Sequence, residues 1–361
     1  MNIKKYFLVL LALALSTYVF FSLPNKSENI QGQEMLHGLI VSISENNGIQ
    51  KIATKITDGS LKGEIVETEE DVTNILNNRG FEVGDKVMVE YNKEHVQFFI
   101  SDFIRTGSLF LLFAIFVVLV IAVAKWQGVG SIMGMIISFL ILFKITLPAI
   151  LNGNDPIFVA VASAVLIVPA TFYMSYGFNK KTHVAVFGTL ITLAIAGVLA
   201  SIFSDMANLT GLASEEASFL KMGTAERINF KGLLLAGMLI GILGVLDDIT
   251  IAQVSVVNEL HKHKPGIKKK ELYKSAMNVG KDHIASMVNT IILIYTGAAL
   301  PLLLLFFDYS ESIGNILNLE LIAEEIIRTL IGSIGLILAV PITTAIAVVV
   351  FLKSPKIRSR R

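Results

Sequence analysis

The chain has 361 residues, of which 53% are hydrophobic and only 16% charged, whereas ordinary soluble domains carry about 25% charged residues. Its formal net charge of +1 excludes a globally basic nucleic-acid-binding protein. The absence of cysteine excludes disulfides, thiolate nucleophiles and zinc–thiolate sites. Long uncharged runs alternate with short charged ones, as in a chain that crosses a bilayer repeatedly, so we expect a multi-pass membrane protein without a cofactor.

The apolar runs predict where the chain crosses the membrane, because a span needs about 20 mostly apolar residues. We predict an α-helical polytopic protein with about eight transmembrane helices, near 6–23, 107–124, 128–148, 156–176, 185–205, 232–254, 285–306 and 329–352. Pro169, Pro301 and Pro341 fall inside these spans, where we expect kinks rather than helix ends. The predicted parts are a signal-anchor helix (1–23), an extracytoplasmic β-rich domain (24–104), a seven-helix transmembrane domain (105–352) and a basic cytoplasmic tail (353–361).

The first span has two interpretations. Lys4 and Lys5 precede the apolar run 6–23, which is also the layout of a cleaved signal peptide. The run is long, however, and no small-x-small cleavage pair follows it. We therefore favour an uncleaved signal anchor.

Residues 24–104 form the soluble-looking part of the chain. In the segment 86–91 polar and apolar residues alternate, so that Val87, Val89 and Tyr91 share one face of a strand. Glycine-containing turn signals recur along the domain, at Asn47-Gly48, Asp58-Gly59 and Gly84-Asp85. About five short strands predict a small OB-like or SH3-like barrel, with a structural or partner-contacting role favoured over ligand binding.

The Lys and Arg residues predict the orientation. With the N-terminus in the cytoplasm, the inner segments carry 17 of these residues and the short outer loops carry four. Both termini are therefore predicted to be cytoplasmic, in the cell membrane. The lysine-rich inner loop 261–281 is expected to contact anionic lipid headgroups.

The sixth span, 232–254, carries ionisable residues at bilayer depth, where they are costly and point to function. Asp247 and Asp248 are adjacent, and Thr250 shares the face of Asp247. The small residues of the same span predict a helix-packing surface formed by Gly237, Gly241 and Gly244.

The seventh span supplies polar partners along one helix face. Residues at steps of four, four, three and seven form this stripe: Asn278, Asp282, Ser286, Asn289 and Thr296. With Thr290 beside it, the stripe predicts an ion or solute site between spans six and seven. The alternative is that these groups only hold neighbouring helices together.

Enzyme classes find no support in these residues. The pair Asp247-Asp248 lacks the further carboxylate about one turn along that a magnesium-diphosphate site needs, since Ile251 and Ala252 stand there. His261 and His263 have no converging carboxylates in their loop for a metal site. We predict no catalytic residues, no metal ligands and no nucleic-acid partner.

Several motifs in the membrane region resemble one family. The run 232–248 is followed by Glu259-Leu-His, Lys270-Glu-Leu-Tyr, Met277-Asn-Val-Gly-Lys-Asp and the segment 288–305. In this order and spacing they resemble the YibE/F family of bacterial multi-pass membrane proteins, whose biochemical activity is not established. The resemblance implies that the family's central motif comprises Asp247, Gly280, Asp282, Asn289 and Thr290, with Lys281 in place of the usual arginine.

Two functions are favoured over a third, an enzyme that acts on lipid or envelope precursors. The first is a permease that moves an ion or small polar solute past Asp247 between spans six and seven. The second is a non-transporting scaffold or sensor whose outer domain binds a partner. A homo-oligomer or a paralogous membrane partner is compatible with either.

Overall fold

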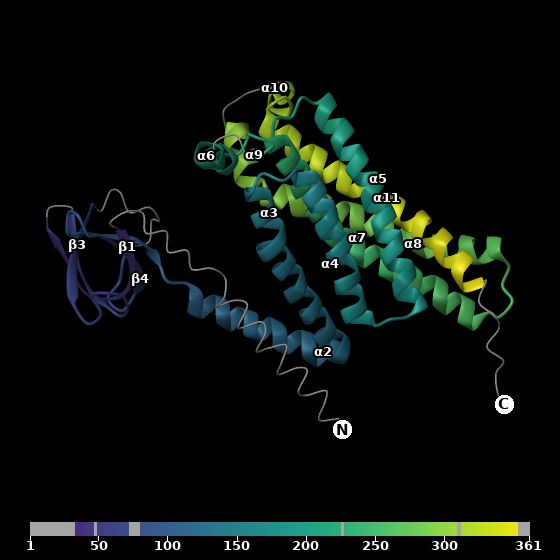
Figure 1. Cartoon of the computed structure of the whole chain (residues 1–361), viewed down its shortest axis with the longest axis horizontal. Coiled ribbons are helices and arrows are strands. Elements are labelled where there is room, and N and C mark those ends of the chain that lie inside the picture. Colours follow the sequence, from purple (N-terminus) through teal and green to yellow (C-terminus); the bar gives the residue numbers. More distant parts are fainter. Residues whose placement is uncertain (1–32, 47–48, 72–79, 225–226, 309–311, 353–361) are drawn as a thin grey trace. The chain divides into compact units, whose positions relative to one another are not determined.

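The computed structural model describes residues 33–46, 49–71, 80–224, 227–308 and 312–352. Within it the chain forms two compact units, one at Thr17–Ala122 and the other from Val123 onward. The first contains a curled antiparallel sheet and the second a helical bundle (Figure 1). The predicted span 6–23 and the basic tail 353–361 lie outside the described residues.

Five antiparallel strands make up the sheet, in the order β3-β2-β1-β4-β5. The strands are β1 (Gln33–Asn46), β2 (Ile49–Ile56), β3 (Ile65–Asp71), β4 (Lys86–Asn92) and β5 (Gln97–Phe103). The edge strands β3 and β5 also contact each other, so the sheet curls round on itself. This confirms the small curled antiparallel sheet, while the OB-like or SH3-like type stays a prediction.

Alternation along the strands builds the core of the sheet. Val87 and Val89 on β4 are fully buried while Lys86 is exposed, as the pattern predicted. The other buried side chains are Leu36, Ile40, Ile52, Ile56 and Val66. Gly59 and Gly84 take positive φ angles of 79° and 99°, which confirms the turns at these two signals.

Polar side chains tie the start of β1 to the turn after β2. Both carboxylate oxygens of Glu34 are engaged: Oε1 accepts from the Ser60 backbone N–H at 3.0 Å, and Oε2 accepts from its hydroxyl at 2.8 Å. Lys93 Nζ lies 2.7 Å from Oε2. These bonds, with Lys93 and then Ser60 as the main causes, lower the pKa of Glu34 from 4.5 to about 2.

The second unit is built from apolar helices. The helical segments of the chain are α2 (Thr106–Ile141), η2 (Leu142–Thr146), α3 (Leu147–Leu151), α4 (Pro156–Tyr176), α5 (Lys180–Met206), α6 (Glu215–Thr224), α7 (Phe230–His263), α8 (Lys269–Ala298), α9 (Leu300–Asp308), α10 (Ile313–Leu317) and α11 (Glu320–Leu352). Helices α4, α5 and α7 begin at side-chain caps, since Asp155, Asn179 and Asn229 each accept a hydrogen bond from a backbone N–H three residues on. At Lys125 the backbone leaves helical geometry (φ 52°, ψ −124°), where the sequence places a turn between two spans.

Five helical stretches in the described residues are long and apolar enough to cross a membrane. They are Thr106–Leu151, Pro156–Tyr176, Lys180–Met206, Phe230–His263 and Glu320–Leu352. The first contains two of the predicted spans. The predicted span 285–306 is divided, because α8 ends at Ala298 and α9 begins at Leu300. Pro301 therefore lies in the first turn of α9, where a missing N–H breaks no helical bond. A membrane protein of mostly helical fold is supported, and the count of eight spans stays a prediction.

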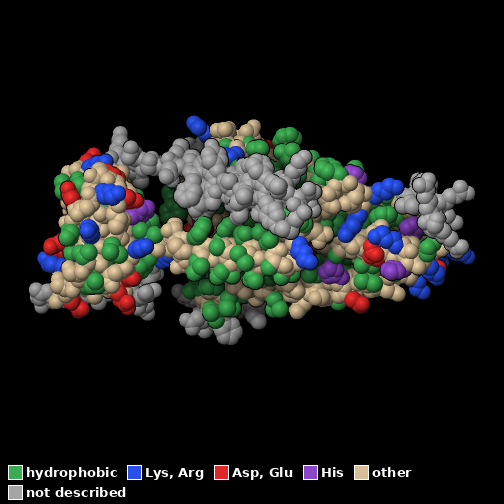
Figure 2. Space-filling model, turned by 90° about the horizontal axis from the view of Figure 1, so that it is seen from below, with side chains coloured by type: hydrophobic (Ala, Val, Ile, Leu, Met, Phe, Trp, Pro, Cys, Tyr) green, Lys and Arg blue, Asp and Glu red, His purple; other side chains and the backbone are tan. Residues whose placement is uncertain are grey.

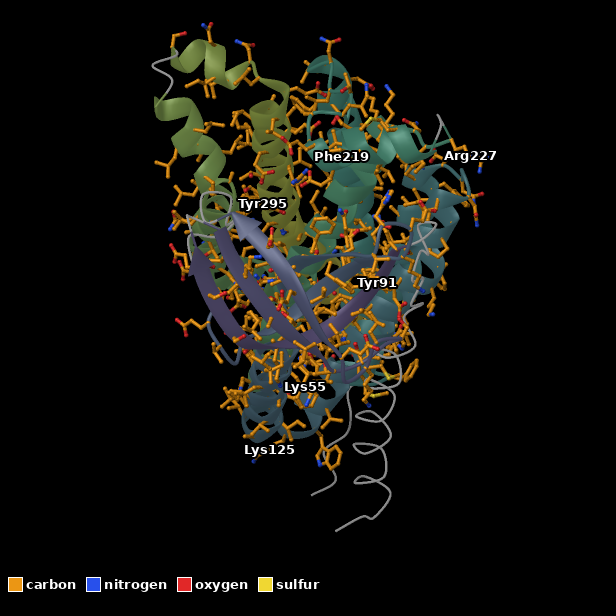
Figure 3. All side chains as sticks on the ribbon, turned by 90° about the vertical axis from the view of Figure 1, so that its left-hand side faces the viewer. Lys55, Tyr91, Lys125, Phe219, Arg227 and Tyr295 are labelled. Atoms are coloured by element: carbon orange, nitrogen blue, oxygen red, sulfur yellow. The ribbon has the colours of Figure 1, made fainter. Side chains whose placement is uncertain are left out.

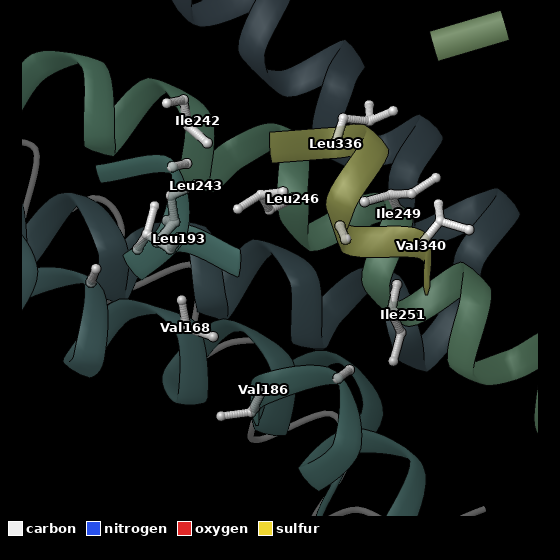
Figure 4. Close-up of a cluster of buried hydrophobic side chains, with 14 of the residues drawn as sticks. Val168, Val186, Leu193, Ile242, Leu243, Leu246, Ile249, Ile251, Leu336 and Val340 are labelled. Atoms are coloured by element: carbon white, nitrogen blue, oxygen red, sulfur yellow. The ribbon is translucent and has the colours of Figure 1, made fainter. Parts of the chain in front are cut away.

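The centre of the bundle consists of α5, α7 and α11, which all pack on one another. Apolar side chains from the three helices converge there, as Figure 4 shows for Leu193, Leu246 and Leu336. A Cβ on Gly335 would lie 3.5 Å from Ala196 on α5 and 3.6 Å from Ile242 on α7. Helix α4 packs on α7 and α5, and α8 packs on α11 and α7.

Two glycines let the second half of α2 approach α4. A Cβ on Gly130 would overlap the carbonyl oxygen of Met174, and one on Gly134 would lie 3.0 Å from Cα of Thr171. Thr171 is therefore held from one side by α2. Its other neighbour, on α7, belongs to the candidate site.

Candidate functional site

Three polar residues of α7 stand three positions apart and reach three different neighbours. Asp247, Thr250 and Gln253 occupy the middle of this 34-residue helix. A step of three residues turns a helix by about 300°, so each side chain points about 60° from the previous one. The three residues therefore form a polar band that joins α7 to α4, α5, α8 and α11.

Asp247 faces α4. Its carboxyl group is within hydrogen-bonding reach of the Thr171 side chain. Oδ1 is buried and has no hydrogen-bond partner among the described residues. Thr171 itself donates to the carbonyl oxygens of Ile167 and Val168, both at 3.0 Å. The carboxyl group of Asp247 is thus the incompletely satisfied member of the band.

Thr250 joins α7 to α5. It is fully buried, and its hydroxyl lies 2.8 Å from the hydroxyl of Thr189. The Thr250 hydroxyl also donates to the backbone carbonyl of Asp247 at 3.2 Å. This bond links the threonine pair to the turn of α7 that carries the carboxylate.

Gln253 joins α7 to α8 and α11. Its Nε2 donates to the carbonyl oxygen of Ala276 at 3.1 Å and to the Thr344 hydroxyl at 2.7 Å. Gly280 makes room for it, since a Cβ there would lie 3.1 Å from the Gln253 amide and 2.5 Å from Val340. The close approach of α8 therefore depends on Gly280.

Thr343 lies beside this band. Its Oγ1 is buried without a partner, and a Cβ on Gly188 would come within 2.5 Å of it. Like Asp247, it presents a buried polar atom that the described residues do not satisfy.

Asp247 and the polar residues of α8 lie on different sides of α7. Gly241 and Gln253 contact α8, the first through the hydroxyl of Tyr295, which would be 3.4 Å from an added Cβ (Figure 3). Asp247 is six residues from each of them, so its side chain points about 120° away from both. Asp247 faces α4, whereas Asn289 is an exposed residue of α8.

The predicted stripe on α8 is exposed. This holds for its candidate site residues Asp282, Ser286 and Asn289, and for Thr290 beside it. The Thr290 hydroxyl donates to the Ser286 carbonyl at 3.0 Å, within its own helix. The stripe is thus a surface of the described bundle, separate from the buried band.

Asp248 and two of the three predicted packing glycines also face outward. Asp248 is exposed, and nothing lies within 4 Å of a Cβ built on Gly237 or Gly244. Of the three, only Gly241 has a neighbour at that range, Tyr295. The two adjacent aspartates therefore have different surroundings: Asp247 is half-buried, with its Oδ1 buried, whereas Asp248 is exposed.

Aromatic residues close the corner between α4 and α5. The Tyr173 hydroxyl lies 2.7 Å from Nδ1 of His183, and the Tyr173 ring stacks on Phe178 with centroids 4.3 Å apart. Lys181 lies over the ring of Tyr176, 5.6 Å from its centroid. On the face in Figure 2, basic side chains and histidines gather at the end of the helical unit that holds the α7–α8 connection. Two of those lysines form ion pairs, Lys262 with Glu259 and Lys264 with Glu271.

Sequence reasoning found Asp247 and Thr250 but missed Gln253 and the threonines on the neighbouring helices: Thr171, Thr189, Thr343 and Thr344. One signal was present, since a glutamine three residues beyond Thr250 continues the step that begins at Asp247. Single threonines in apolar helices are too common to mark a site. In the part of the chain that the structure describes, no three His, Asp or Glu residues are grouped to hold a metal ion.

A family model described as YibE/F-like protein matches residues 112–353. The chain belongs to this family. The match runs from α2 to just past the end of α11, so it covers the whole polar band and leaves out the sheet. No curated protein and no solved structure matches the chain. Membership supports a membrane protein, which agrees with the apolar helices.

Proposed function

We propose that this protein is a permease for a small cation or small polar solute, and that the solute binds at Asp247. The observation that carries the proposal is the buried Oδ1 of Asp247, which has no hydrogen-bond partner among the described residues and lies in the middle of a helix long and apolar enough to span a membrane. A buried ionised carboxylate is costly unless a cation, a proton or a donor compensates it. A solute that supplies this compensation gives the residue a reason to be there.

The neighbours of Asp247 suit such a solute. The hydroxyl of Thr171 on α4 and the threonine pair Thr189–Thr250 place neutral oxygen atoms on two sides of this segment of α7. Hydroxyl and carboxylate oxygens are ligands that small hard cations accept, and they also bond polar solutes. No thiolate ligand is available, because the chain has no cysteine.

An apolar layer borders the site toward the start of α7. Ile242, Leu243 and Leu246 are buried there against Leu193 and Leu336 (Figure 4). Such a layer blocks water and ions until helices move. An occluded polar site beside an apolar barrier is the arrangement that an alternating-access permease requires.

Flux through purified protein in liposomes tests the proposal. Cations and small anions are screened first, and Asp247→Asn is then compared with Asp248→Asn. The exposed Asp248 is the matched control, since both variants remove one charge from adjacent positions. We expect Asp247→Asn to abolish flux while the protein remains folded, and Asp248→Asn to retain most of it. Unchanged flux in Asp247→Asn, or no flux of any solute, would count against the proposal.

The alternative function is a non-transporting scaffold or sensor whose sheet unit binds a partner. It is favoured by large apolar side chains that the sheet unit exposes, among them Ile65, Val83, Val96 and Phe99. It predicts that deletion of residues 34–100 abolishes function while Asp247→Asn is tolerated. Crosslinking followed by purification separates the two, because a stoichiometric partner favours the scaffold.

A further inference from the structure

A second unsatisfied carboxyl group lies at the start of α11. Glu324 is only 6% exposed, and its Oε1 is buried with no hydrogen-bond partner among the described residues. It stands in the second turn of the helix, far from the polar band. The register of Ile242 with Gly332 places Glu324 near the level of residue 234 on α7, about 20 Å along the helix from Asp247.

Neighbouring charges on α11 are engaged elsewhere. Glu320 accepts hydrogen bonds from the backbone N–H groups of Thr210 and Gly211. Arg328, one turn from Glu324, donates to Glu325 at 2.9 Å. Glu324 is therefore next to two other carboxylates, and the nearby guanidinium is already paired.

Helices packed against α11 contribute few charges at this end. Tyr295 on α8 lies within electrostatic range of Arg328 and Glu325. At the end of α5, Asp205 pairs with Lys231 of α7, with Nζ and Oδ1 2.6 Å apart. These groups are either neutral or paired with each other, so they leave the charge of Glu324 uncompensated.

The register of α5 on α11 brings another unsatisfied polar group to the same level. Gly188 faces Thr343 and Ala196 faces Gly335, so the two helices run antiparallel in a constant register. If this register continues to the end of α5 and the start of α11, Ser204 lies within one helical turn of the level of Glu324. Ser204 is fully buried and its Oγ also lacks a partner. Two buried polar side chains, neither with a hydrogen-bond partner among the described residues, thus lie at about the same level of the bundle.

We infer that Glu324 is a proton-binding site, and that it takes its proton from the water at this end of the bundle. A proton from hydronium adds to one carboxylate oxygen, which gives a neutral carboxylic acid with an O–H donor. Release of the proton restores the carboxylate. Protonation removes the cost of a buried charge beside Glu320 and Glu325.

A proton fits this place better than a metal ion. Among the described residues no group of three His, Asp or Glu could hold a metal, whereas a proton needs only one oxygen. The Lys and Arg distribution predicts that this end is extracytoplasmic. This inference rests on the proposed function in one respect only. If the protein is a permease, the proton bound at Glu324 would drive transport.

Infrared difference spectroscopy on the full-length protein in lipid tests the site without any transport assay. We expect a protonated-carboxyl signal at neutral pH that Glu324→Gln reduces by one group per chain and Glu325→Gln leaves unchanged. Glu325 is the matched control, because it is adjacent and ion-paired. An unchanged carboxyl signal in Glu324→Gln would overturn the inference. A sodium-dependent shift in thermal unfolding that Glu324→Gln abolishes would also overturn it, in favour of a sodium site.

A second measurement covers the case in which Glu324→Gln folds poorly. Because Gln mimics the neutral acid, the variant should be at least as stable as the wild type, and thermal unfolding across pH 5–9 should show this. Wild-type stability should fall as the pH rises, and it should fall more steeply than that of the variant. A variant that is less stable than the wild type throughout this range would contradict a neutral Glu324. Neither the infrared signal nor the unfolding temperature depends on transport. Both therefore still test the proton site if the flux measurements contradict the permease proposal.

Discussion

Gln253 on α7 and Thr344 on α11 are joined by a 2.7 Å hydrogen bond in the buried centre of the bundle. The same amide nitrogen donates to the backbone of α8. One side chain therefore connects three helices. Because it lies one turn from Thr250 and two from Asp247, its bonds also hold the polar band in register.

Substitution of Gln253 should loosen this junction. Gln253→Leu removes both hydrogen bonds and leaves Thr344 without this donor, although Thr344 keeps its own bond to the Val340 carbonyl. Hydrogen bonds between membrane helices contribute about 0.6–2 kcal/mol, so we expect a loss of about 1 kcal/mol. Unfolding in mixed micelles measures it, with Thr290→Val as control on an exposed helix face. A loss no larger than that of the control would contradict the role assigned to Gln253.

Packing of α8 on α11 should depend on Gly280. In Gly280→Ala the added methyl group meets Val340 and the Gln253 amide, so α8 must shift. Overpacking of this kind costs about 1–3 kcal/mol, measurable as a lowered unfolding temperature. Gly244→Ala is the matched control, since nothing lies within 4 Å of its Cβ. We expect it to be neutral, and equal losses in the two variants would refute the distinction.

The sheet unit should weaken in acid because of Glu34. The pKa of Glu34 is lowered to about 2 in the folded state, against 4.5 in the unfolded chain. Its contribution is therefore present above about pH 4.5 and is lost as the pH falls toward 2. Since Lys93 is half exposed, we discount the effect for solvent screening to about 1 kcal/mol.

Amide exchange at Ser60 reports on this contribution, because its N–H donates to Glu34. Corrected for the intrinsic pH dependence, protection should fall between pH 5 and pH 3 in the wild type. It should already be reduced, and change little, in Glu34→Gln. The same pH profile in both proteins would exclude Glu34 as the cause.

The predicted orientation is open to direct labelling. The chain has no cysteine, so a single Cys at position 265, in the connection between α7 and α8, has no background. Since this connection is predicted to be cytoplasmic, we expect an impermeant maleimide to label it only after the cells are opened. Phe219 of α6 is exposed, so the substitution Phe219→Cys should be labelled in intact cells. The reverse pattern would invert the topology.

Local sequence patterns predicted much of the fold. Alternation at Val87 and Val89 was sufficient to predict a strand and its buried face, because side chains on a strand point to opposite sides. Uncharged runs predicted α4, α5, α7 and α11 as spans. The break at Ala299 was not visible, since the apolar run 285–306 continues through it and only packing decides where a helix turns.

The candidate site was also predicted only in part from the sequence. By itself the sequence determined that Asp247 lies within an apolar helix, because the uncharged residues on either side of it form a run long enough to span a membrane. Periodicity defines the faces of one helix, but it cannot say which neighbour covers each face. Only the tertiary structure decided that Asp247 faces Thr171 on α4, that the α8 stripe is exposed and that Glu324 is buried. These facts depend on contacts between residues that lie 23 to 91 positions apart, such as those of Gln253, and no local pattern encodes them.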